Sequence, residues 1–209
     1  MTAIQVLGWL GNAAFFSRSF VQWWESERER RSVAPVLFWR LSLLGSITLG
    51  AYAFSRHTHV LLAGYVINGL IYARNLWFQR GTARPLPGAV ATLVALLLAV
   101  ALGAGAIYEL QHREDPSLAW VLVACFGQAL WSSRFVLQWW ASERAAHSHF
   151  PRLFWWLSLA GNALLLAYAL HLGDLVFIAG FAPGPLVQVR NLMLGRGATA
   201  AANQARQDS

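Results

Sequence analysis

Seven apolar runs follow one another along this chain of 209 residues. They occupy residues 4–24, 36–55, 59–78, 88–108, 118–140, 152–171 and 174–194. Each run is close to the roughly 20 residues that an α-helix needs to cross the hydrocarbon core of a bilayer. The pattern therefore predicts an all-α integral membrane protein with seven transmembrane helices.

The first three runs and the last three are copies of one unit. At a single offset of 116 positions, residues 11–76 and 127–192 share 30 identities in 66 positions without a gap. The shared segment Gln-Trp-Trp-x-Ser-Glu-Arg begins at Gln22 and again at Gln138. A repeat of this strength sets the domain organisation. We expect a first three-helix repeat at 1–80, a linker with one transmembrane helix at 81–116, a second three-helix repeat at 117–194 and a disordered cytoplasmic tail at 195–209.

The unpaired run between the copies fixes their relative direction. One additional crossing brings the second copy into the membrane from the same side as the first, so the two repeats are parallel and not inverted. Residues 89–108 are almost entirely Ala, Val, Leu and Gly, and we interpret them as a linker helix with nothing polar to offer a substrate. The sequence thus predicts a 3+1+3 arrangement of two parallel three-helix bundles.

Composition agrees with a membrane location and suggests an orientation. Hydrophobic residues make up 57% of the chain and charged residues 12%, well outside the usual range of soluble domains. All 16 basic residues are Arg; nine lie on one side of the predicted membrane, against only Arg56 and Arg113 on the other. The positive-inside rule then places the N-terminus in the periplasm and the C-terminus in the cytoplasm. The net charge of +7 reflects topology and not nucleic-acid binding.

Five arginines lie inside the predicted spans, namely Arg18, Arg40, Arg74, Arg134 and Arg190. An ionisable side chain near the bilayer centre costs at least about 2.5 kcal/mol and is seldom there without use. In the repeat, Arg18 corresponds to Arg134 and Arg74 to Arg190. One interpretation is snorkelling, because Arg18 lies only about 9 Å below the interface that Trp24 marks. We favour the other, in which guanidinium groups from both repeats converge on a polar cavity and bind phosphate oxygens.

Repeated amide side chains accompany these arginines. Gln22 and Gln138 lie one helical turn after an arginine, on the same helix face. The predicted substrate-binding residues are Arg18, Gln22, Arg74, Asn75, Arg134, Gln138, Arg190 and Asn191, with Asn12 and Gln128 as further amide candidates.

Two acidic residues and two tryptophans receive secondary roles. Glu27 and Glu143 lie at the predicted cytoplasmic ends, where capping or ion pairing with a nearby arginine is favoured over a general-acid role. Trp23 and Trp139 belong to tryptophan pairs that anchor a helix at the membrane interface. One tryptophan of each pair is also a candidate to pack against a ligand.

Prolines interrupt the last span. Pro183 and Pro185 must disturb a helix in mid-membrane, and the corresponding residues 65–69 include Asn and Gly instead. Broken or pliable helices at related positions of two repeats point to a transport site, so we assign these prolines a gating role. The chain carries no P-loop, dinucleotide fingerprint, nucleophile elbow or metal-ligand spacing. We therefore expect no metal, no cofactor and no catalytic residue.

These shared motifs resemble a known family. The pattern Gln-Trp-x-x-Ser-Glu-Arg, then Pro-x-x-Phe-Trp-x-x-Ser-Leu-x-Gly, then Arg-Asn-Leu occurs in both copies. It resembles the lipid A biosynthesis N-terminal domain, a bacterial membrane module sometimes fused to lipid-A-disaccharide synthase. The helix plan is also similar to that of SWEET and PQ-loop transporters, although the Pro-Gln pair of the latter is absent. The resemblance implies the bacterial inner membrane and lipid-linked sugar metabolism.

Together these features predict a transporter or flippase for a lipid-linked, phosphate-bearing sugar, such as a polyprenyl-phosphate sugar or a lipid A precursor. One alternative is a non-catalytic membrane subunit that docks a glycosyltransferase to its lipid substrate. Another is a SWEET-like carrier of neutral sugars, against which the buried arginines argue. We expect no enzymatic activity, since the repeat contains no paired acid and base. The expected partners are the anionic lipid, the surrounding membrane lipids and, in the docking alternative, a glycosyltransferase, with no nucleic acid.

Overall fold

The structure is a computed structural model that describes residues 2–30, 33–80, 88–112, 117–145 and 151–193, and all regular structure in these ranges is helical. The helices are α1 (Ala3–Glu29), α2 (Val36–Ser55), α3 (His59–Phe78), α4 (Gly88–His112), α5 (Leu118–Ala145), α6 (Arg152–Leu172) and α7 (Leu175–Phe181). The tail predicted at 195–209 lies outside the described residues. The apolar runs therefore locate every described helix to within a few residues, except at the C-terminal ends of α1 and α5, which extend further, and in the last run.

The local sequence accounts for where the helices begin. Thr2 and Gln5 form a capping box at the start of α1, in which the Thr2 backbone N–H donates to Gln5 Oε1 over 2.9 Å. Pro35 and Pro151 directly precede α2 and α6 in an extended conformation, where the missing N–H costs nothing. This agrees with the favourable position that proline has at a helix start.

The last predicted run is broken where its prolines stand. Helix α7 ends at Phe181, residues 182–183 form a turn, and a helix resumes over 184–193. The corresponding part of the first repeat behaves differently, because α3 continues without interruption through residues 65–69. The expectation of weak points in both repeats is thus corrected, since Asn and Gly keep the backbone N–H groups that a helix needs and proline does not.

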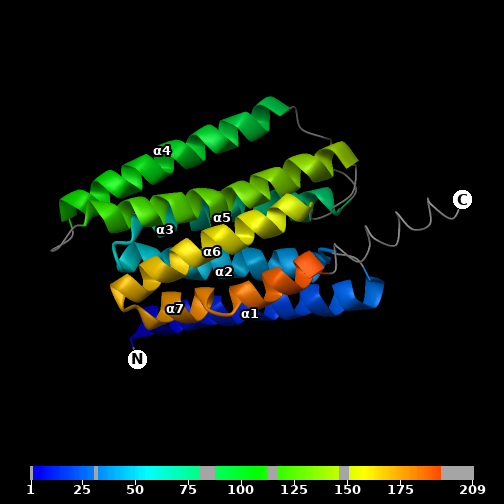
Figure 1. Cartoon of the computed structure of the whole chain (residues 1–209), viewed down its shortest axis with the longest axis horizontal. Helices are drawn as coiled ribbons and strands as arrows, with labels where there is room; N and C mark the ends of the chain where they lie inside the picture. The colour runs from blue at the N-terminus through cyan, green and yellow to red at the C-terminus, as the bar shows by residue number, and fades with distance from the viewer. Residues whose placement is uncertain (1, 31–32, 81–87, 113–116, 146–150, 194–209) are drawn as a thin grey trace, which may run out of the picture.

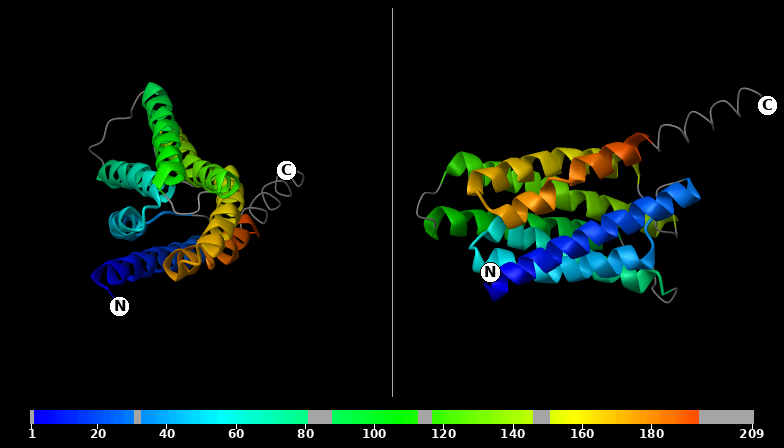
Figure 2. Two further views of the ribbon diagram at one scale, coloured as in Figure 1. Left: turned by 90° about the vertical axis from the view of Figure 1, so that its left-hand side faces the viewer. Right: turned by 90° about the horizontal axis from the view of Figure 1, so that it is seen from below.

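The helices run roughly side by side along the long axis of the molecule (Figure 1). Helix α2 packs between α1 and α3, and α6 packs between α5 and α7. Two seams join these sets, one between α3 and α5 and the other between α1 and α7. Helix α4 packs against both α3 and α5, and the end-on view in Figure 2 places it over that seam, far from α1.

Aromatic side chains form the core where the sets meet. The Phe135 ring of α5 lies 4.8 Å from Tyr72 of α3 and 6.3 Å from Trp39 of α2, both in edge contact. Such offset contacts add stability beyond the area that the rings bury. The α3–α5 seam is therefore a tightly packed part of the core.

Five helical segments in the described ranges are long and apolar enough to cross a membrane: Val36–Ser55, Gly88–His112, Leu118–Ala141, Arg152–Leu172 and Leu175–Met193. Helices α1 and α3 have the necessary length, with 27 and 20 residues, but their polar and aromatic side chains lower their hydropathy. These features support a membrane-associated helical protein. The seven-span plan and its orientation stay predictions.

Candidate functional site

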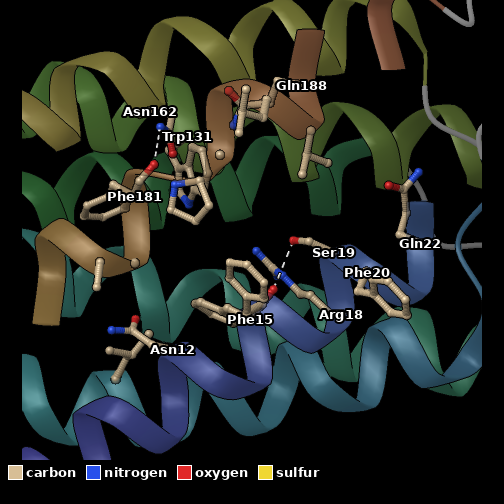
Figure 3. A pocket seen from close by; sticks show the side chains of 18 of the residues that line it. Asn12, Phe15, Arg18, Ser19, Phe20, Gln22, Trp131, Asn162, Phe181 and Gln188 are labelled. Atoms are coloured by element: carbon tan, nitrogen blue, oxygen red, sulfur yellow. Dashed lines mark hydrogen bonds between the residues drawn. The ribbon is translucent and has the colours of Figure 1, made fainter. Parts of the chain in front are cut away.

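A cavity of about 570 Å³ lies between α1 on one side and α5, α6 and α7 on the other. Figure 3 shows Arg18 and Asn12 facing it from α1, opposite Asn162 and Gln188. Most of its wall is apolar, and aromatic rings are the commonest side chains in it. The polar side chains that line it are Asn12, Arg18, Ser19, Gln22, Arg134, Asn162 and Gln188.

Two arginines at equivalent positions of the repeat form the charged part of the cavity. Arg18 and Arg134 are 6% and 4% exposed. Arg18 Nη1 donates to Ser42 Oγ over 3.0 Å, and Arg134 Nη1 donates to Ser158 Oγ, the equivalent serine, over 2.9 Å. The Phe135 ring lies against both guanidinium groups, with its centroid 6.0 Å from one Cζ and 4.5 Å from the other. The two repeats thus bring their cations to one aromatic-walled space.

No carboxylate in the described part of the chain forms an ion pair with Arg18 or Arg134. Their partners are hydroxyl groups and aromatic faces, and Arg134 Nε is buried with no hydrogen-bond partner among the described residues. Buried charges are normally paired, because an uncompensated ion loses several kcal/mol of hydration. The cavity therefore has the electrostatics of an anion site.

The second predicted pair of arginines lies elsewhere. Arg190 is nearly half exposed and forms an ion pair with Glu27 of α1, with 2.7 Å between Nη2 and Oε1. Arg74 is partly buried beside the rings of Trp77 and Phe78. Neither lines the cavity. The structure thus brings two of the four predicted phosphate ligands together and leaves two at the arginine-rich end of the helices.

The four predicted amides pair with one another across the two seams. Gln22 Nε2 donates to Asn191 Oδ1 over 3.1 Å, which joins α1 to the last helical segment. Gln138 Nε2 donates to Asn75 Oδ1 over 3.3 Å, which joins α5 to α3. We call these two contacts the amide ties. They are equivalent in the repeat, and only Gln22 of the four also lines the cavity.

Carboxylates form a matching pair of contacts at the opposite end. Tyr52 Oη donates to Asp174 Oδ2 over 2.8 Å, and Asp174 Oδ1 caps α7 by accepting from Val176 N over 3.0 Å. Tyr168, the equivalent of Tyr52, donates to Glu109 of α4. The other Glu109 oxygen accepts from the backbone N of Val60, the equivalent of Val176, over 2.8 Å. We call these the carboxylate ties.

Three amide oxygens at the cavity have no hydrogen-bond donor among the residues that the structure describes. Asn12 Nδ2 donates to the Val176 carbonyl over 2.6 Å, and Asn162 Nδ2 donates to the Phe181 carbonyl over 2.8 Å. These bonds fix which atom of each amide is oxygen. The Oδ1 atoms of both residues, and Oε1 of Gln188, are buried without a donor. The site therefore combines guanidinium donors with free amide acceptors.

Comparison with known proteins decides the family. The model of the lipid A biosynthesis N-terminal domain matches the chain twice, at residues 7–77 and 123–193. This chain belongs to that family. Both cavity arginines and all four residues of the amide ties fall inside the matched segments, whereas Glu109 lies between them.

The curated relatives are longer proteins from Chlamydia. The chain is 31% identical over 199 residues to a lipid-A-disaccharide synthase of Chlamydia pneumoniae, with 90% of this chain and 33% of that protein covered. A lipid-A-disaccharide synthase of Chlamydia trachomatis serovar D is 30% identical over 206 residues, with the same shares covered. This member of the lipid A biosynthesis N-terminal domain family thus spans about one third of the length of the relatives it matches. No solved structure matches it.

The residues assigned gating or secondary roles lie in different surroundings. Trp23 and Pro183 line the cavity, and Pro185 follows in the next turn. Trp139, the equivalent of Trp23, is only 5% exposed and belongs to the hydrophobic core. The side chain of Glu143 lies outside the described residues.

Sequence reasoning missed Asn162, Gln188, Asp174 and Glu109. Each is a lone polar residue beside or within an apolar run, and that is the signal that would have found it. None has an identical counterpart in the other copy of this domain: Ser46, Tyr72 and Thr58 stand opposite the first three, and Glu109 lies in the linker.

Proposed function

We propose that this domain binds and translocates a lipid-linked, phosphate-bearing sugar, with the phosphate between Arg18 and Arg134. The observation that carries the proposal is two buried guanidinium groups, one from each repeat, that face one cavity and have no carboxylate partner in the described ranges. A phosphate supplies the missing negative charge and accepts several N–H donors at once. The ligand class follows from this need.

The free amide oxygens favour a sugar next to that phosphate. Asn162 Oδ1 and Gln188 Oε1 are buried acceptors without donors. A buried acceptor left unpaired costs about 1 to 3 kcal/mol, which a hydroxyl-rich ligand recovers. Sugar hydroxyls donate hydrogen bonds, whereas a phosphate that is fully ionised only accepts them. A phosphorylated sugar satisfies both sets of groups.

The transport mechanism in this proposal is a rocking of two parallel three-helix bundles about the central site. The amide ties close the site toward the arginine-rich end and the carboxylate ties close it toward the other. Breaking one set at a time would give alternating access. The proposal includes the 3+1+3 SWEET-like plan, an inner-membrane location, a periplasmic N-terminus and a cytoplasmic C-terminus.

The decisive experiment is translocation of a labelled short-chain polyprenyl-phosphate sugar in proteoliposomes that contain only this protein. We expect Arg18→Gln plus Arg134→Gln to lower both binding and translocation at least about tenfold, since hydrogen bonds to charged groups contribute about 1.5 to 3 kcal/mol each. Arg40→Gln is the matched control, because Arg40 is exposed on α2 and does not line the cavity. Arg18→Lys plus Arg134→Lys keeps the charge and should retain part of the affinity. Equal activity in the double Gln variant and the control would overturn the proposal.

Gln188 offers a separate test of sugar recognition. Gln188→Met keeps the volume but removes the acceptor, so binding of the polyprenyl-phosphate sugar should weaken by about three- to tenfold. Binding of a polyprenyl phosphate without a sugar should stay within about twofold of wild type. Titration of both lipids against both proteins measures this difference. An equal loss of affinity for both lipids would show that Gln188 does not contact the sugar.

The synthase relatives favour a second candidate function. They are named lipid-A-disaccharide synthase and continue for about two thirds of their length beyond the matched region. In this candidate the domain holds the lipid substrate for a glycosyltransferase and does not move it across the membrane. Arginine-dependent binding without translocation, together with a transferase that works only in the presence of this domain, would select it over the flippase.

A further inference from the structure

The two seams of the molecule are equivalent in the repeat but differ in packing. Helix α4 lies over the seam between α3 and α5, with Leu98 and Leu102 buried in the core (Figure 2). Among the described helices, none packs over the seam between α1 and α7 in the same way. The linker helix thus seals one seam and leaves the other uncovered.

Residues at equivalent positions of α1 and α5 differ in how much of their surface is exposed. Phe16 of α1 is 62% exposed, whereas Ser132, its counterpart on α5, is 0% exposed. Trp23 is 38% exposed and its counterpart Trp139 only 5%. Since Trp23 and Trp139 are the same residue type, the difference between them reflects their positions in the fold.

The uncovered seam opens at its middle and is closed at both ends. Near one end Asn12 of α1 bonds the Val176 carbonyl of α7, and near the other Gln22 bonds Asn191. Between these contacts, Phe16, Phe20, Pro183 and Leu186 line the cavity. Phe16, Phe20 and Leu186 are also exposed on the outer surface. The turn at 182–183 carries the chain away from a straight helix path at this level.

We infer that this gap, which we call the lateral portal, admits the hydrocarbon chain of the ligand sideways from the bilayer. The inference rests on the proposed function and specifies the lipid part of that ligand. An opening with an aromatic and aliphatic rim suits a polyprenyl or acyl chain, while the arginine pair just inside takes its phosphate. A water-soluble sugar phosphate gains nothing from an apolar side entrance. With both ends tied, a lipid is the ligand that reaches the site through the side.

Site-specific photocrosslinking tests the lateral portal. A benzophenone amino acid is introduced at Phe20 or Leu186 in the full chain in proteoliposomes, with labelled polyprenyl phosphate as the probe. Leu44 on α2 is the matched control, because it is an exposed apolar residue away from the cavity. Val136, the counterpart of Phe20, reports on the sealed seam. We expect at least about fivefold more crosslinking at Phe20 and Leu186 than at Leu44 or Val136, since a bound head group raises the local concentration of its chain.

The outcomes separate this inference from the proposed function. Equal crosslinking at all four positions, or more at Val136 than at Phe20, would overturn the lateral portal even if translocation is intact. Portal crosslinking that disappears in Arg18→Gln plus Arg134→Gln would support it, because the chain is then held by its head group. Portal crosslinking in a protein that fails to translocate would keep the lateral portal and reject the flippase.

Discussion

Glu109→Ala is expected to lower the free energy of unfolding by about 3 kcal/mol, because it leaves two buried donors without an acceptor. The carboxylate is fully buried and accepts from the Val60 N–H at the start of α3 and from the Tyr168 hydroxyl of α6. Removing the carboxylate takes away the side-chain cap of α3 and the hydrogen bond that links α4 to α6. Thermal or denaturant unfolding in detergent measures the loss. Glu109→Gln is the matched control, since its amide oxygen preserves one acceptor.

The repeat supplies a rescue for this variant. At the position of Asp174, which caps α7, the first copy has Thr58, whose side chain does not cap α3. Thr58→Asp in the Glu109→Ala background should therefore recover about 1 kcal/mol, the usual contribution of a helix cap. In the wild-type chain the same change should destabilise, because it sets a second carboxylate beside Glu109. The same sign of effect in both backgrounds would contradict this account of the carboxylate ties.

Asn162→Leu is expected to lower the free energy of unfolding by about 2 to 3 kcal/mol. Adding Pro185→Ala to this variant should restore much of the lost stability. Pro185 has no N–H, so the Phe181 carbonyl four residues earlier lacks its helical donor. Asn162 Nδ2 supplies the bond instead, over 2.8 Å. Leucine has nearly the same shape but leaves the buried carbonyl unpaired, and the N–H that Pro185→Ala restores can satisfy it.

A double-mutant cycle on unfolding free energies measures this coupling. Pro185→Ala alone should change stability by less than about 1 kcal/mol, because the carbonyl already has a donor. Strictly additive losses would show that Asn162 and the proline turn act independently. Asn162→Asp is a useful second variant, since it keeps the size of the side chain but removes the donor. It should lose as much stability as Asn162→Leu or more.

Most of the helical plan was predictable because it depends on hydropathy alone. Runs of about 20 apolar residues are long enough to be recognised without any tertiary information. The place of Arg18 and Arg134 at one cavity was predictable for a related reason. A charge inside an apolar run is easy to recognise, and its recurrence in both repeats makes a chance occurrence unlikely. Arg74 and Arg190 meet the same criteria but lie outside the cavity. Sequence position gives the depth of a residue along the helix and not the direction it faces after packing.

The missed residues share one property, which is that they break the repeat. Gln188 lines the cavity, whereas its counterpart Tyr72 is buried outside the cavity lining and its hydroxyl accepts from Arg18 over 3.1 Å. A search that used repetition to select functional residues discarded Gln188 and Asn162. In the proposed function the two copies share one ligand that has no symmetry of its own, and residues that differ between the copies would then contact its different parts.

The amide ties have a mechanical consequence. Exchanging the two copies converts one tie into the other, so a rocking that separates the two bundles equally on both sides lengthens both bonds together. If one tie breaks, the other still holds the two bundles together, and their relative motion increases little. Separation of the bundles at that end therefore requires both hydrogen bonds to break together.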